Sequence, residues 1–468
     1  MNGILHNIST DTIAAISTAM GSAGIGIIKV SGPLAINSTL SLFRQKNYTV
    51  LPEKKIISHK MIHGWMLDPD HDTMIDEVLW VCMKKPHSYT GEDVAEIHTH
   101  GSHVVLQSIL EQILNTPNVR LAKPGEFTRR AYMNGRIDLT HAEAVMDVIS
   151  AQTQQTLTLT SAHLTGQLKK TIESMRDQMI QWLATIEASI DFPDDMSDEQ
   201  DPSDIQASLT SLIDQINHYI ADYHQTAIYR DGAKVVIVGR PNVGKSSLLN
   251  CLLAKDRAIV SNQPGTTRDV IDGQVNIANV PMTLFDTAGI HISFDNIEQQ
   301  GISRAKALIQ QAHLILLVIE AGKELTQNDF QIYDEIGNGK MIVCANKIDQ
   351  VQHQNTIHLP EHWPQPINIS AKYHMGIDQL KQTIATMVTG NKDNMPSPEF
   401  MINLRQKNCL ETSKECLEQA LSACVNNMPL DCATIDISLA LDALGEMIGV
   451  VHNEQMLDQI FSSFCIGK

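Results

Sequence analysis

The sequence feature that most constrains this chain is residues 239–247, which read G-R-P-N-V-G-K-S-S. The β-branched run at 235–238 predicts a buried strand before them, and residues 247–253 predict the start of a helix after them. A glycine-containing turn of this kind aims backbone N–H groups and the positive end of a helix dipole at one place. The spacing G-x-x-x-x-G-K-S therefore predicts a polyphosphate site, in which Lys245 reaches the phosphates and Ser246 ligates Mg²⁺.

Further segments follow in the order that a GTPase requires. Asp286 ends a predicted strand and can hold Mg²⁺ through water, while the Gly289 N–H can meet the γ-phosphate. Thr267 lies between this segment and the phosphate loop, where a second Mg²⁺ ligand is expected. Asp349, in N-K-I-D, can accept the two neighbouring donors that guanine has and adenine lacks. Residues 370–372, S-A-K, then support the base, so the segments together predict GTP binding.

The predicted GTP-binding residues come from all of these segments. They are Asn242, Val243, Gly244, Lys245, Ser246, Ser247, Ser261, Asn262, Gln263, Pro264, Gly265, Thr266, Thr267, Asp286, Thr287, Ala288, Gly289, Asn346, Lys347, Ile348, Asp349, Ser370, Ala371 and Lys372. The predicted Mg²⁺ ligands among them are Ser246 and Thr267.

The segment after D-T-A-G lacks a residue that Ras-like hydrolysis commonly uses. Such hydrolysis commonly uses a glutamine just after D-T-A-G, together with an arginine finger, but Ile290 and His291 follow Gly289 in this chain. A bound monovalent cation that bridges the phosphates is a second solution. Asn242 offers an oxygen for such a cation, and the loop at 261–266 can close over it.

Composition sets the broad class of the protein. The chain has 468 residues, enough for two to four domains, and a formal net charge of −18 argues against coating nucleic acid by broad electrostatics. Its eight cysteines include no C-x-x-C pair and are expected to be reduced thiols. The first residues lack the charged flank and long apolar core of a signal peptide, and no apolar stretch approaches membrane-spanning length. We therefore expect a cytoplasmic protein with no membrane partner.

The first part of the chain, residues 1–120, predicts an α+β domain. Strands are predicted at 25–30, 77–82 and 95–100, and Val105, Ile109 and Ile113 recur at helical spacing. The same region contains three histidines, which are candidate metal ligands or ordinary polar lining: His98, His100 and His103. Because no further ligand follows at a fixed spacing, the pattern favours polar lining.

The remaining chain predicts helices on both sides of an α/β region. Apolar residues from Leu164 to Ile190 recur at intervals of three and four, as one long helix of a bundle would, over a region at 121–230. Residues 231–388 alternate helical stretches with strands at 235–238, 282–285, 314–319, 341–344 and 367–369, the pattern of a parallel sheet. Helical spacing returns over 389–468, ending with Ile437 to Val451. The nucleotide domain is thus predicted to be inserted between two halves of one helical domain.

These motifs resemble the MnmE (TrmE) family of bacterial tRNA-modification GTPases. The resemblance rests on G-R-P-N-V-G-K-S-S, P-G-T-T-R-D, D-T-A-G, and the terminal F-C-I-G-K at 464–468, and it extends to S-Y-T-G-E-D-V-A-E at 88–96 and K-P-G-E-F at 123–127. It covers essentially the whole chain. It implies a multidomain fold: an α+β N-terminal folate-binding domain, an α-helical bundle, and an inserted Ras-like α/β P-loop GTPase domain.

The resemblance also assigns a potassium ion and a catalytic residue. The K⁺ ligands that it implies are Asn242, Ser261, Gln263 and Thr266, and the glutamate that positions the attacking water corresponds to Glu298. On the residue pattern alone, Glu298 would be a solvated helix charge.

A folate site and a C-terminal cysteine are implied in the same way. The positions that match the family's site for formyl-tetrahydrofolate (or methylene-tetrahydrofolate) are Lys29, Glu96, Arg136 and Lys468. Lys29 stands where an arginine is usual, and 21–24, G-S-A-G, lacks the arginine of the family's glycine turn. Cys465 has either a part in the modification or no role beyond that of a thiol in a buried tail.

The resemblance implies a homodimer, joined through the N-terminal domains, that hydrolyses GTP when its two GTPase domains meet. With the FAD-dependent MnmG protein it would form a heterotetramer that modifies C5 of the wobble uridine of certain tRNAs. Two alternatives are a regulatory GTPase switch in ribosome assembly and a folate-binding enzyme whose GTPase is only structural. The folate positions and the C-terminal C-I-G-K disfavour the first, and the intact magnesium and guanine motifs disfavour the second.

Overall fold

The computed structural model describes residues 11–19, 21–46, 49–191, 202–256, 271–286, 307–337, 339–351, 359–390, 399–426, 428–451 and 453–468. The chain forms two compact units. One comprises Met1–Met146, Leu164–Ala184 and Leu441–Lys468, and the other Asp147–His163 and Thr185–Ala440. The four domain ranges predicted from the sequence stay a prediction.

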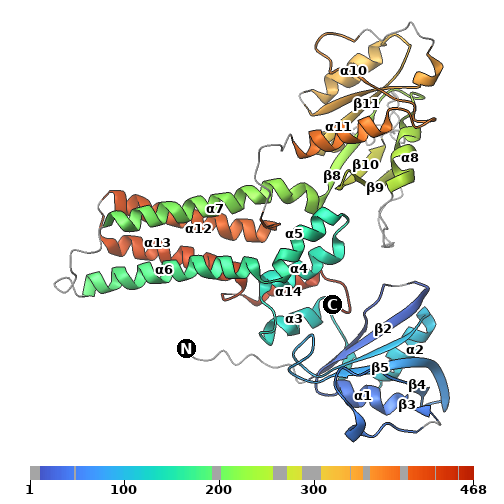
Figure 1. Ribbon diagram of the computed structural model, residues 1–468, viewed down its shortest axis with the longest axis vertical. Coiled ribbons are helices and arrows are strands. Elements are labelled where there is room, and N and C mark those ends of the chain that lie inside the picture. The colour runs from blue at the N-terminus through green and yellow to red at the C-terminus, as the bar shows by residue number, and fades with distance from the viewer. Residues whose placement is uncertain are drawn as a thin grey trace, which may run out of the picture. The chain divides into compact units, whose positions relative to one another are not determined.

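A seven-stranded sheet, in the order β3-β4-β5-β6-β2-β1-β7, forms the N-terminal part (Figure 1). Only β1 and β7 pair in parallel. The strands are β1 (Thr12–Ile16), β2 (Ala23–Ser31), β3 (Phe43–Arg44), β4 (Ile62–Asp68), β5 (Thr73–Met83), β6 (Val94–Gly101) and β7 (Val119–Leu121). With α1 (Ala35–Leu42), α2 (His103–Leu114) and the short η2 (Glu53–Lys55), they confirm the predicted α+β character.

The alternation of side chains along β2 and β6 gives this sheet two different faces. Ile28, Val30 and Ile97 are buried in a core that also contains Trp80 and residues of α2. Lys29 and Glu96 are paired in register and lie between these core positions in sequence. Because successive residues of a strand point to opposite faces, Lys29 and Glu96 lie on the face opposite the core.

The C-terminal tail lies against the N-terminal part of the chain. α3 (Glu126–Met133), α4 (Leu139–Ser150) and α14 (Glu454–Ser462) share an apolar cluster that contains Leu139, Leu457, Phe461 and Phe464. Beyond α14, the Gly467 carbonyl accepts a hydrogen bond from the Ser17 hydroxyl at 3.2 Å. This packing brings the last residues of the chain beside β1.

Two of the long helices, α6 (Gln167–Asp191) and α13 (Leu430–Ile448), each differ at one end from the helices predicted from the sequence. Further helices are α5 (Gln154–Leu164), α7 (Pro202–Asp231) and α12 (Leu404–Val425). The long helix predicted from Leu164 to Ile190 is confirmed from Gln167 onward. Only Leu164 lies outside it, at the end of α5, because Gly166, at φ +74°, separates the two helices. Val451 likewise lies outside α13, which ends before Gly449 at φ +84°. None of the helices described here is both long and apolar enough to cross a membrane.

A six-stranded sheet, in the order β13-β12-β11-β8-β10-β9, carries the nucleotide motifs. Its elements are β8 (Ala233–Val238), α8 (Lys245–Asp256), β9 (Ile271–Ile277), β10 (Val280–Asp286), β11 (Leu314–Glu320), α10 (Gln327–Ile336), β12 (Met341–Asn346), η4 (Ile348–Gln350), β13 (Ile367–Asn368) and α11 (Ile377–Thr389). The five strands that the sequence predicted pair in parallel, which confirms that prediction. β9, which was not predicted, adds an antiparallel edge by pairing with β10. Ala278 and Asn279, both with positive φ, form the tight turn between these strands.

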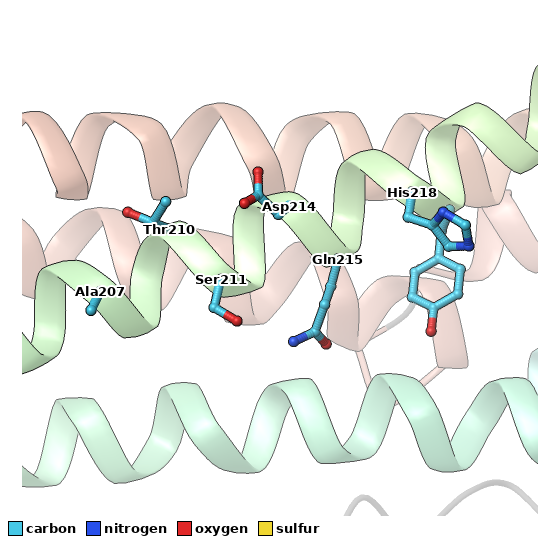
Figure 2. A pocket seen from close by; sticks show the side chains of 7 residues that line it. Ala207, Thr210, Ser211, Asp214, Gln215 and His218 are labelled. Carbon is cyan, nitrogen blue, oxygen red and sulfur yellow. The ribbon is translucent and has the colours of Figure 1, made fainter.

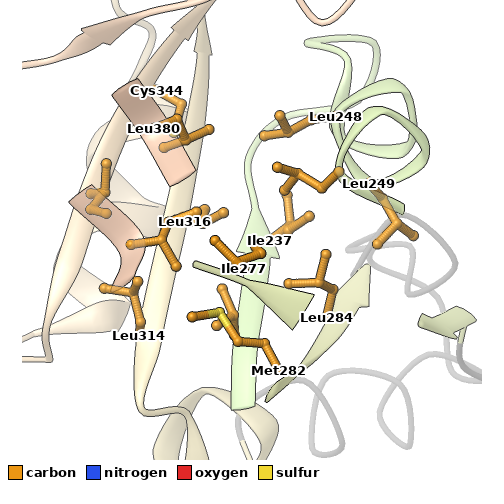
Figure 3. Close-up of a cluster of buried hydrophobic side chains, with 14 of the residues drawn as sticks. Ile237, Leu248, Leu249, Ile277, Met282, Leu284, Leu314, Leu316, Cys344 and Leu380 are labelled. Carbon is orange, nitrogen blue, oxygen red and sulfur yellow. The ribbon is translucent and has the colours of Figure 1, made fainter. Parts of the chain in front are cut away.

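Both faces of this sheet are covered. Ile237, Leu284 and Leu316 belong to a cluster with Leu248 and Leu249 of α8 (Figure 3). The alternate residues of β8, Val236 and Val238, belong to a second cluster on the other face. Strands buried on both faces read as continuous apolar runs, which is why the sequence predicted most of them.

The segment that returns from the nucleotide-binding part of the chain is attached to α7. Phe400, Met401 and Ile402 are buried. Asp222, which is 1% exposed, accepts a hydrogen bond from the Glu399 N–H at 3.0 Å, and Arg230 donates to the Ile402 carbonyl at 2.6 Å. Burial raises the pKa of Asp222, and hydrogen bonds from the backbone of Glu399 and Phe400 oppose that shift.

We expect Asp222→Ala to destabilise the fold by about 1–3 kcal/mol, because it leaves buried N–H groups without an acceptor. The matched control is Asp214→Ala, an exposed position on the same helix. The measurement is the denaturation midpoint of each variant at neutral pH. Equal midpoints for the two variants would contradict the role assigned to the Asp222 carboxylate.

Candidate functional site

The phosphate loop is shaped by two glycines at which a side chain has no room. Gly239 has φ +148°, and a Cβ there would collide with the Val318 carbonyl oxygen at the end of β11. Gly244 has φ +103°, and a Cβ there would collide with the side-chain amide of Asn346. The loop therefore follows β8 directly and leads into α8, which begins at Lys245, two residues earlier than predicted.

Lys245 is held at the centre of this loop. Its Nζ donates to the carbonyl oxygens of Gly239 and Arg240, both at 2.9 Å. Burial lowers the pKa of Lys245, and the charge of Asp286 opposes that shift. The Arg240 side chain points elsewhere, since its Nε donates to the fully buried Asp329 at 2.8 Å.

The predicted magnesium groups lie next to each other. The Ser246 hydroxyl donates to Oδ2 of Asp286 at 2.7 Å, and Asp286 is only 3% exposed. The hydroxyl comes from the start of α8 and the carboxylate from the end of β10, and both are oxygen donors of the kind that Mg²⁺ prefers. The residues described here thus fit a magnesium ion at the phosphate end of the site.

The guanine motif also fixes the phosphate loop. Asn346 donates to the Val243 carbonyl at 2.9 Å and accepts from the Ala371 N–H at 3.0 Å. Lys347 donates from Nζ to the Asn242 carbonyl at 2.7 Å. The predicted base and phosphate motifs are therefore parts of a single network.

The predicted base-recognition carboxylate is itself held in place. Ser370 donates to Oδ1 of Asp349 at 2.6 Å, which links S-A-K to N-K-I-D. Ile348 lies next to Asp349 in η4. Ser247 and Lys372, at the ends of their motifs, are exposed.

Other predicted residues of this site lie outside the described part of the chain. They are Ser261, Asn262, Gln263, Pro264, Gly265, Thr266, Thr267, Thr287, Ala288, Gly289 and Glu298. Of the predicted K⁺ ligands, Asn242 alone is described. It adopts φ +64°, a left-handed conformation that asparagine tolerates better than most residues.

A second polar cluster lies on the outer face of the N-terminal sheet. The Lys29 Nζ lies 3.7 Å from Oε1 of Glu96, 5.0 Å from the centre of the Tyr89 ring and 5.7 Å from that of Phe127. Burial lowers the pKa of Lys29, and the positive charge of Lys468 adds to that effect, whereas Glu96 opposes it. Lys468 therefore lies close enough to influence this cluster.

Arg136 joins the same cluster through Tyr89. Its guanidinium lies 5.6 Å from the centre of the Tyr89 ring and donates to the Tyr89 carbonyl at 2.6 Å. Two of the four predicted folate positions, Lys29 and Arg136, thus lie at the Tyr89 ring, and the other two, Glu96 and Lys468, lie near Lys29. A carboxylate flanked by cations and ring faces fits a flat heterocycle that has N–H donors and an anionic tail.

His98, for which the sequence favoured polar lining over a metal ligand, lies in this cluster, although its place beside Glu96 was not predicted. The buried Nε2 of His98 has no hydrogen-bond partner among the described residues and lies 3.5 Å from Oε2 of Glu96. The i, i+2 spacing of Glu96 and His98 on one strand was the available signal. His100 instead pairs with Asp76 at 2.7 Å, and His103 begins α2. Within the described chain, no three acidic, histidine or cysteine side chains are grouped to hold a metal.

Cys465 is exposed, so the alternative that placed its thiol in a buried tail is wrong. Its backbone carbonyl accepts from the Gly125 N–H at 3.3 Å, which fixes the backbone and leaves the side chain at the surface.

A hollow of about 710 Å³ lies along α7, away from these motifs. Figure 2 shows the side chains that line it, all of them on that helix. They are Ala207, Thr210, Ser211, Asp214, Gln215, His218 and Tyr219. None of them belongs to a motif that the sequence singled out.

Two protein-family models match the chain. The MnmE helical domain matches residues 139–465, and the GTP-binding protein TrmE N-terminus matches residues 12–136. Among solved structures, Era from Aquifex aeolicus is 31% identical over 39% of this chain and 66% of its own, with a TM-score of 0.29.

Curated relatives match nearly the full length. The tRNA modification GTPase MnmE of Natranaerobius thermophilus is 40% identical over 98% of this chain and 99% of its own. The tRNA modification GTPase MnmE of Syntrophus aciditrophicus is 41% identical over the same shares. With the assembled nucleotide site and both family matches, this similarity shows that the chain belongs to the MnmE family of tRNA modification GTPases.

Proposed function

We propose that this protein is a potassium-activated GTP hydrolase that acts in tRNA wobble-uridine modification. With an FAD-dependent MnmG partner, it installs a carboxymethylaminomethyl or aminomethyl group at C5, using a one-carbon unit of formyl- or methylene-tetrahydrofolate. The observation that supports the GTPase part most directly is the bond from Lys347 to the Asn242 carbonyl, which joins base recognition to the phosphate loop. We further propose a cytoplasmic homodimer that forms a heterotetramer with the partner.

In the proposed hydrolysis, the chain's own groups hold the nucleotide in place. Lys245 exchanges the carbonyls of Gly239 and Arg240 for the phosphate oxygens of GTP. Ser246 and Thr267 would ligate Mg²⁺, and Asp286 would hold it through water. When bound, Mg²⁺ neutralises charge on the phosphates.

The proposed potassium site uses the unusual backbone of Asn242. Lys347 occupies its carbonyl oxygen, so the side-chain amide oxygen is the group that would contact the cation. Ser261, Gln263 and Thr266 would complete the site, and Glu298 would orient the attacking water as the catalytic residue. A monovalent cation would then supply the positive charge that an arginine finger provides elsewhere.

The proposed folate site uses the cluster around Tyr89. Glu96 would accept the N–H donors of the pterin, and His98 offers a buried nitrogen beside it. Lys29, Arg136 and Lys468 would pair with the anionic glutamate tail. We propose that the exposed Cys465 takes part in the modification chemistry.

Asn242→Gly should abolish the preference for potassium over sodium in GTP turnover. Glycine keeps the left-handed backbone without strain and removes the side chain that carries the amide oxygen. The matched control is Asn279→Gly, an exposed turn residue with the same φ of +64°. Turnover is measured in KCl and NaCl at equal ionic strength. An Asn242→Gly enzyme that is still activated by potassium would refute the cation site.

Asp349→Asn should weaken GTP binding by roughly 100-fold or more, because an amide cannot accept both guanine donors. Xanthosine triphosphate, which presents an acceptor where guanine has its amino group, should bind the variant better than GTP does. Equilibrium titration with fluorescent analogues of both nucleotides measures this. Unchanged preference for GTP would remove Asp349 from base recognition.

Glu96→Gln should weaken binding of formyl-tetrahydrofolate by about 10- to 100-fold, since a charged acceptor of the pterin donors is lost. Glu77→Gln, on the neighbouring strand β5 and exposed, is the control. Calorimetric titration of the protein without GTP separates this result from turnover. Similar affinities for the two variants would argue against the assigned folate site.

A further inference from the structure

A group of basic side chains gathers at one end of the β4–β5 hairpin. We call it the basic end; it consists of Lys54, Lys55, His59, Lys60, Lys84, Lys85 and His87. All seven residues are exposed. Neither the GTP site nor the folate cluster uses any of them.

Backbone contacts bring the two chain segments of the basic end together. The His59 N–H donates to the Cys82 carbonyl at 2.8 Å, and the Lys84 N–H donates to the Ser58 hydroxyl at 3.0 Å. Lys55 lies three residues before Ser58, so chain geometry limits the distance between their Cα atoms to roughly 10 Å. The two segments therefore lie side by side, and the five lysines on them are exposed.

Charge is separated along this hairpin. Its turn at the other end carries Asp68, Asp70 and Asp72, and β4 between the ends has seven residues. A strand of that length spans about 24 Å, well beyond the screening length of about 8 Å at physiological salt. Segments 53–60 and 84–87, which carry the five lysines of the basic end, contain one carboxylate, Glu53, and Asp93 is a further one nearby in sequence. The basic end is thus a local positive surface on a chain of net charge −18.

The chemistry of this surface fits a phosphate backbone. Lysine ammonium groups are point charges that neutralise phosphates without reading bases. The apolar side chains exposed among them, Ile57 and Met61, offer no aromatic ring on which a base could stack.

We propose that the basic end binds the phosphate backbone of tRNA. This inference rests on the proposed function, in which tRNA is the substrate. It gives the acidic chain a defined contact of its own with the nucleic acid, apart from any contact that the partner protein makes.

The test compares two full-length variants of equal charge change. One carries Lys→Gln substitutions at the basic end, at Lys54, Lys55, Lys84 and Lys85. The control carries them at Lys169 and Lys170 of α6, at Lys323 between β11 and α10, and at Lys414 of α12. The dissociation constant for tRNA is measured by fluorescence anisotropy from 50 to 300 mM KCl, and GTP turnover without tRNA is measured for each.

The basic-end variant should bind tRNA at least about tenfold more weakly at 150 mM salt. The slope of its log association constant against log salt concentration should be less negative by about three. The control should stay within about twofold of the parent, and both variants should turn over GTP as the parent does. Equal losses in the two variants, or an unchanged slope, would overturn the proposal.

Two further results distinguish a failure of this inference from a failure of the proposed function. A parent protein that does not bind tRNA would count against the tRNA part of the proposed function itself. Binding of the parent but not the variant to phosphatidylserine vesicles, with tRNA affinity unchanged, would assign the surface to lipid and overturn the proposal. If the quadruple variant is unstable, the Lys54/Lys55 and Lys84/Lys85 double variants give the same comparison.

Discussion

The nucleotide site depends on two hydrogen bonds that start at the end of β12. Asn346 and Lys347 donate to the carbonyl oxygens of Val243 and Asn242 and so fix the middle of the phosphate loop. The loop approaches β12 closely because Gly244 has no side chain, and it is held at its start by the contact of Gly239 with β11. These contacts stabilise two costly features of the loop. They are the left-handed backbone of Asn242 and the buried ammonium group of Lys245.

The cluster on the N-terminal sheet depends on a different constraint, the alternation of side chains along a strand. Ile28 and Val30 must face the core, so Lys29 faces the opposite side beside Glu96. A largely buried ammonium group is costly unless a negative charge or an aromatic face compensates it. Glu96 and the rings of Tyr89 and Phe127 provide that compensation.

Much of the fold followed from local patterns, since buried strands such as 235–238 and 314–319 are continuous apolar runs. β9 was missed because its sequence, I-D-G-Q-V-N-I, is half polar, as suits an edge strand with one exposed side. The break at Gly166 was missed because the apolar spacing continues across it. At the site, motif spacing predicted which groups meet, such as Ser246 with Asp286. It could not predict that Arg240 pairs with Asp329, 89 residues away, because only the tertiary fold brings them together.

The pairing of Arg240 with Asp329 has a consequence for how charge is supplied to the phosphates. One carboxylate oxygen of Asp329 accepts from Arg240, while the other accepts from the N–H and hydroxyl of Thr326 at the start of α10. Withdrawing the guanidinium would strand a negative charge in the interior, at a cost of about 3–5 kcal/mol. Arg240 is thus fixed in an ion pair and is not free to move to the phosphates. A positive charge that stabilises the phosphates during bond cleavage must therefore come from another group.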